Sequence, residues 1–386
     1  MKGHDVRALA INGQALPGVS LDSYPILRAN GSDVHRLAID FESKVIRAES
    51  CANKMLFLRD QGFIPDLIVA HPGWGESLFC KSVFPNAKLV HFIEFHYGKG
   101  LDVNFDPEFL IGNNEDSWRI KVKDAANLLS LDLMDLGISP TQWQKSSIPD
   151  LFQSKVEVVF DGVDTTRVKP DSTSFIKLSS DSFGEKRFSY GDEVLTFVNR
   201  NLEPYRGYHS FMRSLPRVMK VRPNANIIIV GGDEVSYGKP PSNGKSWKDI
   251  YLEEVMADLD MSRIFFVGKI PYNVYLNLLQ VSRCHVYLTY PFVMSWSAIE
   301  AMSAGALVVG SNTPPVQEFI EHEKNGLLVD FFDYENLAST VIDCLANPKI
   351  YNQLKKAARS TIIERYDLNS ICIPKQLSLL SRLMDY

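Results

Sequence analysis

Short apolar segments alternate with longer stretches of helical period along most of the chain. Several of these segments are apolar at nearly every position, which is typical of parallel strands buried on both faces. Between them lie amphipathic stretches such as 207–221 and 333–346. This alternation predicts an α/β fold of doubly wound parallel sheets. The predicted strands are 66–70, 88–95, 156–160, 193–199, 226–232, 263–268, 285–290 and 306–310.

Residues 164–192 interrupt this pattern, because they are rich in Ser, Asp, Lys and Pro and show little periodicity. Such composition predicts a linker and surface structure. We therefore expect an N-terminal Rossmann-like domain over residues 1–185 and a C-terminal one over 190–363, facing each other across a cleft. The last stretch, 364–386, is helical apart from Pro374 and is expected to cross back to the N-terminal domain.

The composition agrees with two domains and excludes several classes of protein. A chain of 386 residues is too long for one compact core, and 45% hydrophobic with 23% charged residues excludes a disordered or fibrous protein. A net charge of -5 gives no reason to expect nucleic-acid binding. Five scattered cysteines without a CxxC pair exclude a disulfide scaffold and a zinc cluster, as in a reducing cytosol. Because the chain has neither a long apolar run nor a signal-peptide pattern, we expect it in the cytoplasm.

One basic cluster leaves contact with the inner membrane face open. Six basic residues between positions 200 and 222 face one acid, Glu203, and such clusters attract anionic lipid head groups. A solvated helix face is the more common explanation, and we favour it.

Four segments of the second half are expected to meet, because ligands of such sheets bind at the carboxyl ends of the strands. The first is 198–207, where Arg200 and Arg206 flank a turn that contains Pro204 and is followed by a helix. Two guanidinium groups beside a helix N-terminus suit a diphosphate. Taken alone, two solvated surface arginines are the simpler interpretation.

The second and third segments end predicted strands in glycine. Gly231 and Gly232 close the strand 226–232, and Gly268 closes the strand 263–268 just before Lys269. Glycines at these positions let the backbone approach a ligand closely. An ordinary strand–turn–helix corner explains them equally well.

The fourth segment, 290–320, is the most specific. Ser295 and Ser297 lie where a helix should begin, and Gly305 lies where it should end, so Glu300 falls in the first turn or two. Backbone N–H groups at this N-terminus can face an anion, and the Glu300 carboxylate can accept hydrogen bonds from hydroxyl groups. A first-turn glutamate that merely favours the helix dipole is the alternative.

The second half resembles the C-terminal half of GT-B glycosyltransferases, specifically the retaining family 4. The matching motifs, in chain order, are the Arg-x5-Arg turn, the VGG and FVG strands, the EAMSAG helix and LVVGSNTPPVQEFI. In the first half, DLIVAHPGWGE (66–76), SPTQW (139–143) and DGVD (161–164) also match. The resemblance implies a nucleotide-sugar donor on the C-terminal domain, an acceptor on the N-terminal domain and transfer with retention. It implies no cofactor and no metal for the chemistry.

The resemblance also implies residue roles. Arg200 and Arg206 would hold the donor diphosphate and stabilise the leaving group, Glu300 would accept the ribose hydroxyls, and Lys269 with Ile270 would border the base. The loop 294–297 would contact sugar and phosphate through N–H groups. The full expected donor site comprises Asn199, Arg200, Arg206, Gly232, Asp233, Gly268, Lys269, Ile270, Met294, Ser295, Trp296, Ser297 and Glu300.

The chain departs from the family in two places. The family has two glutamates separated by seven residues, and the first position is Phe292 here, so Asn199, Asp233 or Glu234 would have to supply the missing polar contact. KGHDVRAL resembles the family's second strand, so a first strand–helix unit of roughly 25–30 residues is expected to be missing, and we favour a start-site error.

In the first half, Glu94 lies nearest to the position where the family often has a catalytic histidine, with His91 and His96 close by. Glu94 would hydrogen-bond a sugar hydroxyl or the attacking hydroxyl; an ion pair with Lys99 or a bond to a backbone N–H is the alternative. Trp74 is a stacking platform for a sugar ring or a buried structural residue. The pair Asp258-x-Asp260 resembles a metal motif, but it precedes a strand and is interpreted as a solvated turn.

The leading hypothesis is therefore a retaining hexosyltransferase (EC 2.4) that uses a nucleotide diphospho-sugar. A UDP-linked donor is expected because the resemblance to the family implies it. Its acceptor would be a saccharide or a lipid-linked glycan in polysaccharide biosynthesis. The alternative is an inactive nucleotide-sugar-binding protein that acts as a partner or regulator. An NAD-dependent oxidoreductase is excluded because no GxGxxG follows a strand.

Overall fold

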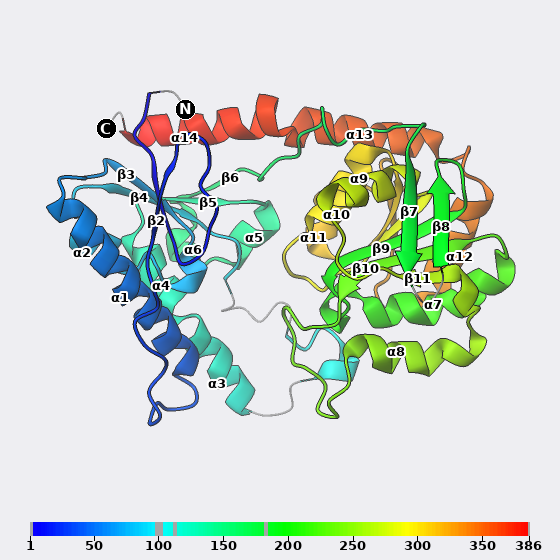
Figure 1. The fold of residues 1–386 in the computed structure, drawn as a ribbon, viewed down its shortest axis with the longest axis horizontal. Helices are drawn as coiled ribbons and strands as arrows, with labels where there is room; N and C mark the ends of the chain where they lie inside the picture. The colour runs from blue at the N-terminus through cyan, green and yellow to red at the C-terminus, as the bar shows by residue number, and fades with distance from the viewer. Residues whose placement is uncertain (1–2, 97–102, 111–113, 181–183, 385–386) are drawn as a thin grey trace. The chain divides into compact units, whose positions relative to one another are not determined.

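The computed structural model describes residues 3–96, 103–110, 114–180 and 184–384. Its contacts divide the chain into a first unit, Met1–Phe160 with Gln376–Tyr386, and a second unit, Asp161–Lys375. Both units are drawn in Figure 1. The division after Phe160 differs from the expected boundary at 185, and the returning segment begins at Gln376 rather than at 364.

The second unit is built on a sheet of six parallel strands in the order β11-β10-β9-β12-β13-β14. When the strands of this sheet alone are numbered in chain order, it reads 3-2-1-4-5-6, the doubly wound arrangement. The winding reverses between β9 and β12, so the carboxyl ends of these two strands mark the ligand-binding edge. The strands are β9 (Val194–Asn201), β10 (Asn226–Gly232), β11 (Ile264–Phe266), β12 (Cys284–Tyr287), β13 (Leu307–Ser311) and β14 (Leu327–Val329).

Two groups of helices cover this sheet, on opposite faces as Figure 1 shows. In α7, the residues Phe211, Leu215 and Val218 share one stripe and are fully buried, which fixes the helix against the sheet. One group is α7 (Tyr208–Val221), α8 (Trp247–Val255) and α12 (Tyr334–Ala346); the other is α9 (Tyr272–Val281), α10 (Trp296–Ala304) and α13 (Asn352–Tyr366), with short α11 (Pro314–Gln317) beside β13.

The segment predicted as a linker contains an antiparallel hairpin, β7 (Phe175–Ser180) with β8 (Gly184–Ser189). Ile176 and Leu178 alternate with exposed residues in β7, and they pack with Phe188 into the core of the second unit. The linker prediction was wrong. The two strands have six residues each and are rich in Ser and Lys, so their period-2 alternation of apolar residues is hard to recognise in the sequence.

The first unit has a parallel sheet in the order β3-β4-β5-β6. Residues near the start form a separate parallel pair, β1 with β2. In α14 (Ile373–Met384), Leu379 is buried against Val90, Ile138 and Val159 of the first unit. The strands are β1 (Arg7–Ala10), β2 (Ser20–Ser23), β3 (Leu67–Ala70), β4 (Lys88–Phe92), β5 (Leu136–Ser139) and β6 (Val156–Val158); the helices are α1 (Ile39–Asp60), α2 (Cys80–Val83), α3 (Asn114–Lys123), α4 (Ala125–Leu133), α5 (Gln142–Ser147) and α6 (Asp150–Gln153).

The segments that enter and leave the second unit are fastened together. Val163 forms a parallel bridge with Asp367, and the Thr165 hydroxyl donates to the Asp367 carboxylate at 2.5 Å. Gly162 has φ +93°, and a Cβ there would lie 2.7 Å from Cα of Leu368, so this crossing has no room for a side chain.

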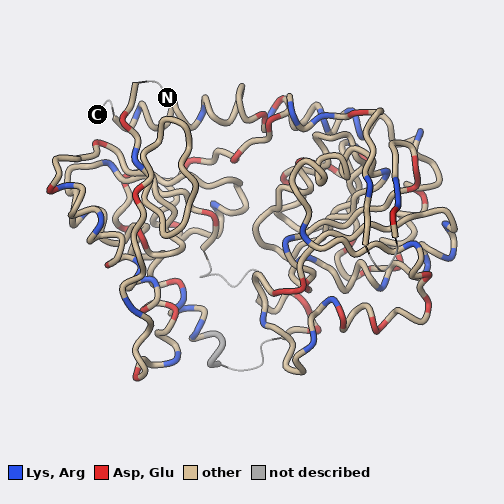
Figure 2. Tube along the Cα trace, viewed as in Figure 1, with Lys and Arg blue, Asp and Glu red and all other residues tan. Residues whose placement is uncertain are grey.

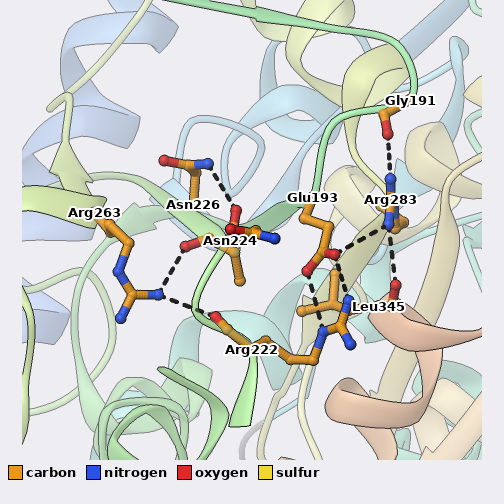
Figure 3. Close-up of polar contacts among 9 residues, drawn as sticks. Gly191, Glu193, Arg222, Asn224, Asn226, Arg263, Arg283 and Leu345 are labelled. Carbon is orange, nitrogen blue, oxygen red and sulfur yellow. Dashed lines mark hydrogen bonds and ion pairs between the residues drawn. The ribbon is translucent and has the colours of Figure 1, made fainter. Parts of the chain in front are cut away.

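A network of charged residues closes the amino ends of the strands in the second unit (Figure 3). Glu193 pairs with Arg222 and with Arg283, the latter at 3.7 Å. Arg263 donates to the backbone carbonyls of Arg222 and Ala225. This network lies at the opposite strand ends from the ligand-binding edge, and its role is structural.

In the described part of the chain, three of the six basic residues between 200 and 222 form ion pairs. Arg213 pairs with Glu254 at 2.5 Å and Arg217 with Glu335 at 2.9 Å, while Arg222 belongs to the network of Glu193. Figure 2 shows acidic residues interleaved with basic ones over the second unit. Half of the cluster is therefore salt-bridged, whereas we had favoured a merely solvated helix face. Of the helices in the described ranges, none combines the length and the apolar character needed to span a membrane.

Candidate functional site

Arg206 ends the short helix η4 (Pro204–Arg206), which follows β9, and its side chain is buried. The guanidinium Nη1 donates to the Thr289 hydroxyl at 2.8 Å, to the Val293 carbonyl at 2.8 Å and to the Tyr287 hydroxyl at 3.2 Å. Gly207 makes this approach possible: its φ is +67°, and a Cβ there would lie 2.3 Å from Cβ of Leu288. Arg206 is thus held against the carboxyl end of β12, at the switch point.

The groups that accept hydrogen bonds from Arg206 are neutral. The guanidinium carbon lies 5.0 Å from the ring centroid of Tyr237 and 5.8 Å from that of Phe292. The neighbouring carboxylate of Glu203 instead accepts backbone N–H groups of residues 236–238, at 3.1 to 3.4 Å. Among the residues that the structure describes, no carboxylate forms an ion pair with Arg206. Burial disfavours the Arg206 charge, but the Tyr287 and Tyr237 hydroxyls and the Glu203 carboxylate outweigh this effect and raise the pKa of Arg206. Because its direct hydrogen-bond partners are neutral, the guanidinium can still pair with an anionic ligand.

Two side chains at the end of β9 add unpaired donors. Arg200 is exposed and has no hydrogen bond or ion pair within the described ranges. Asn199 is buried, and its amide nitrogen has no hydrogen-bond partner in the described part of the chain. Both residues belong to the donor site expected from the sequence, and they lie on the strand that borders the switch point.

The loop before α10 is linked to Arg206 through Tyr287. The Tyr287 hydroxyl accepts the backbone N–H of Ser295 at 2.7 Å and the guanidinium of Arg206 at 3.2 Å. Ser295 is the N-cap of α10, and its hydroxyl accepts from the N–H of Ser297. Met294 and Ser297 are buried, whereas Trp296 is 53% exposed. The predicted helix start is confirmed, but the N–H groups of Ser295 and Ser297 already have acceptors in the protein.

Glu300 lies in the second turn of α10 and is almost completely buried. Its Oε1 accepts the Tyr272 hydroxyl, and its Oε2 accepts the Tyr275 hydroxyl at 2.7 Å. Burial raises the pKa of Glu300 above its ordinary value, although the two hydroxyl donors oppose this shift. The carboxylate can accept hydroxyl groups, as predicted, and in this structure both donors are tyrosines.

The glycine-terminated strands also converge. The backbone N–H of Gly231 donates to the Gly268 carbonyl at 3.1 Å, and a Cβ on Gly232 would lie 2.9 Å from Cε of Lys269. Lys269 is exposed and pairs with Glu234 at 3.3 Å, whereas Ile270 packs against the core of the unit. Gly268 has φ +62°, which turns the chain toward these two residues.

Phe292, at the position of the missing glutamate, is buried among aromatic rings. Its centroid lies 4.9 Å from Tyr237 and 5.8 Å from Tyr205. Of the three residues considered as replacements, Asp233 pairs with Lys248 at 3.3 Å and Glu234 with Lys269. Only the Asn199 side chain keeps a buried polar atom unpaired, so it is the best placed of the three.

In the first unit, Glu94 meets His71, and these residues follow the neighbouring strands β4 and β3. His71 Nε2 lies 3.4 Å from Glu94 Oε2, and His71 Nδ1 accepts the Gly73 N–H at 3.1 Å. Because Nδ1 is an acceptor, the neutral imidazole carries its proton on Nε2, toward Glu94. Lys99, considered as a partner of Glu94, lies outside the described residues.

The other residues of the first unit that we considered for the site differ in exposure, since two histidines are buried and one tryptophan is exposed. His91 is fully buried in β4, and His96 is buried beside Asp124, with Nε2 2.7 Å from a carboxylate oxygen. Trp74 is 62% exposed in the short helix η1 (Pro72–Trp74), with Arg47 5.6 Å from its ring. The buried structural alternative for Trp74 is therefore wrong.

Asp260 is a capping residue rather than part of a metal motif. It is the N-cap of a short helix just before β11, and its carboxylate accepts from Ser262 and pairs with Arg263 at 2.8 Å. The interpretation of Asp258-x-Asp260 as a turn at the opposite strand ends is confirmed.

Sequence reasoning missed the residues that hold the site together. Tyr287 and Thr289 contact Arg206, Tyr272 and Tyr275 hold Glu300, and Glu203 fixes the loop 236–238. A signal was available for the first pair: residues 287 and 289 alternate at the end of a buried strand, so their side chains share one face.

Two family models together match most of the chain. Residues 2–168 match the model described as glycosyl transferase family 4 group, and residues 180–361 match glycosyl transferases group 1. Among curated relatives, a glycogen synthase of Mycobacterium tuberculosis is 22% identical over 259 residues, which covers 66% of this chain and 54% of that protein. The chain spans about half to two thirds of the length of the first curated relatives that it matches.

Solved structures share the fold over the whole chain. A sucrose-phosphate synthase from Thermosynechococcus elongatus has a TM-score of 0.72 at 17% identity and covers 99% of this chain and 89% of that one. HepE from Anabaena, in complex with UDP and glucose, has a TM-score of 0.61 at 18% identity and covers 94% and 87%. At these identities the likeness establishes a fold with two Rossmann-like domains and nothing finer.

Proposed function

The chain belongs to the GT-B glycosyltransferases, and from this we propose that it transfers a sugar from a nucleotide diphospho-sugar to a hydroxyl group of a saccharide or lipid-linked acceptor. We further propose a retaining transfer, a UDP-linked donor and a role in polysaccharide biosynthesis. The GT-B relative HepE, which was solved with UDP and glucose, supports the choice of UDP as the first nucleotide to test.

The observation that carries the proposal is the buried guanidinium of Arg206, whose direct hydrogen-bond partners are all neutral. A diphosphate beside it would supply a directly paired anion, and Arg200 together with the Asn199 amide would donate further hydrogen bonds to the same group. These donors lie at the switch point of the sheet, where ligands of this fold bind. A glycosyltransferase needs such positive charge when the nucleoside diphosphate departs.

The remaining roles follow the same arrangement. Glu300 would hold the ribose, the 294–297 loop would face the sugar and phosphates, and Lys269 with Ile270 would border the base. We propose that the two arginines supply the positive charge that a metal supplies in other transferases, so that EDTA leaves the rate unchanged. In the first unit, Glu94, paired with His71, would bind the acceptor hydroxyl.

The test is calorimetric titration with UDP, GDP and ADP in EDTA, followed by transfer assays with the sugars of the nucleotide that binds. We expect micromolar binding of one nucleotide, weakened at least tenfold by Arg200→Ala. Lys220→Ala is the matched control, because Lys220 is an exposed basic residue of α7 on the same unit. Failure of all three nucleotides to bind, or equal losses in both variants, would overturn the proposal.

A further inference from the structure

The two tyrosines that hold Glu300 differ in exposure. Tyr272, the first residue of α9, is 42% exposed and bonds Oε1, whereas Tyr275 is half-buried and bonds Oε2. Glu300 itself is 4% exposed. The side of this carboxylate that Tyr272 covers is therefore the more exposed of the two.

Arg167 holds Tyr272 at its ring. The guanidinium carbon lies 4.6 Å from the Tyr272 centroid, a cation–π contact. Gln280, at the other end of α9, donates to the Lys169 carbonyl at 2.8 Å, so the segment around Arg167 runs along this helix. Tyr272 is thus fixed at its hydroxyl by Glu300 and at its ring by Arg167, and the hydroxyl can leave the carboxylate by rotation of an exposed side chain.

We propose that Tyr272 is a displaceable cover of the ribose-binding carboxylate: the ribose hydroxyls of the nucleotide replace the Tyr272 hydroxyl on Glu300, and the hydroxyl returns when the nucleotide leaves. This inference rests on the proposed function and adds an affinity-determining residue to it. The exchange trades one hydrogen bond to the carboxylate for others, so no buried charge is left unpaired at either stage. Tyr272 therefore lowers the affinity for the nucleoside diphosphate and favours its release after transfer.

The experiment compares Tyr272→Phe with the wild type by titration with UDP and with 2′,3′-dideoxy-UDP. The phenylalanine keeps the ring over Arg167 but removes the competing hydroxyl. We expect UDP to bind about tenfold tighter, the effect of one hydrogen bond that no longer has to be broken. The dideoxy nucleotide has no hydroxyl to place on Glu300, so its affinity should not change.

Tyr275→Phe is the matched control, because its hydroxyl bonds the same carboxylate from the buried side and is not displaced. We expect this variant to bind UDP no tighter than the wild type. An equal gain in Tyr275→Phe, or equal gains for both nucleotides in Tyr272→Phe, would overturn the inference, as would unchanged or weaker UDP binding by Tyr272→Phe.

A kinetic readout separates a cover from a merely structural residue. If the nucleotide is released by return of Tyr272, Tyr272→Phe lowers the donor KM and the UDP inhibition constant together, by about the same tenfold factor. UDP binding that is lost in Arg200→Ala but unaltered in Tyr272→Phe would leave the proposed function standing and overturn this inference alone. No nucleotide binding by either the wild type or Tyr272→Phe would overturn both.

Discussion

The indole Nε1 of Trp296 donates a hydrogen bond to a carboxylate oxygen of Asp161 at 3.1 Å, between residues 135 positions apart. Trp296 is the first residue of α10, in the loop proposed to face the donor, and Asp161 is the first residue of the second unit. The loop at the ligand-binding edge is therefore fastened to the segment by which the chain enters this unit.

Trp296→Phe and Asp161→Ala should be coupled in a double-mutant cycle. Each variant removes the same hydrogen bond, so the loss of unfolding free energy in the double variant should be smaller than the sum of the single losses, by about 1 kcal/mol. Urea unfolding of the four chains measures this coupling. Strictly additive losses would show that the bond contributes nothing to the stability of the loop.

Arg200→Ala and Arg206→Ala should both weaken nucleotide binding but differ in stability. Arg200 has no partner in the described ranges, so its removal should change the unfolding free energy by less than about 0.5 kcal/mol. Arg206 satisfies Tyr287, Thr289 and the Val293 carbonyl, so its removal should cost about 1–3 kcal/mol. Nucleotide titration and urea unfolding of the same samples measure the two effects separately. If both variants lost the same unfolding free energy, the view that the hydrogen bonds of Arg206 stabilise the fold and Arg200 does not would be contradicted.

Gly207→Ala should destabilise the chain more than Gly244→Ala. Both glycines have positive φ, +67° and +77°, so alanine costs about 1 kcal/mol at either position. A Cβ on Gly207 would also lie 2.3 Å from Cβ of Leu288, whereas Gly244 has nothing within 4 Å. We expect a further loss of about 1–3 kcal/mol at Gly207 from this clash. Thermal and urea unfolding provide the comparison, and equal losses would mean that β12 moves aside freely.

Mild acid should destabilise the chain through His91. Burial lowers the pKa of His91 from its ordinary 6.5 to about 4. Between these values the unfolded chain takes up a proton that the folded chain does not, so the unfolding free energy should fall as the pH decreases from about 6.5 toward 4, by about 1 kcal/mol per pH unit.

His91→Gln should reduce this pH dependence, because the amide does not titrate. Urea unfolding at pH 7.5 and 5.0 measures the difference for each chain. The same substitution at exposed His4 is the control and should leave the difference unchanged. An unaltered difference in His91→Gln would show that other groups account for the acid sensitivity.

The regular part of the fold was readable from the sequence. Continuous apolar runs such as 226–232 identified buried parallel strands, and the amphipathic stretch 207–221 became α7, because burial on both faces or on one stripe leaves a periodic signature. The hairpin β7–β8 and the short strands β5 and β14 were missed, since three to six residues with polar neighbours give no distinct period.

For the site, sequence order was sufficient to place charged residues at the correct strand ends but not to say what each contacts. Arg200 and Arg206 are six positions apart in similar local sequence, yet one is exposed and unpaired and the other is buried. The difference comes from Tyr287 at the end of β12 and Thr289 just after it, which accept the Arg206 guanidinium, and from Gly207, which lets the turn approach that strand. Contacts between strands so distant in sequence leave no periodic signal along the chain.

The second unit is continuous in sequence, Asp161–Lys375, whereas the first is completed only by residues 376–386. During synthesis, every residue of the second unit leaves the ribosome before Leu379, which packs against Val90, Ile138 and Val159. The first unit is thus synthesised first but completes its fold last. Until Leu379 packs against it, the apolar residues of its four-stranded sheet that contact Leu379 stay uncovered. A chain arrested before residue 376 would contain all of the second unit and a first unit in which Val90, Ile138 and Val159 lack their contact with Leu379.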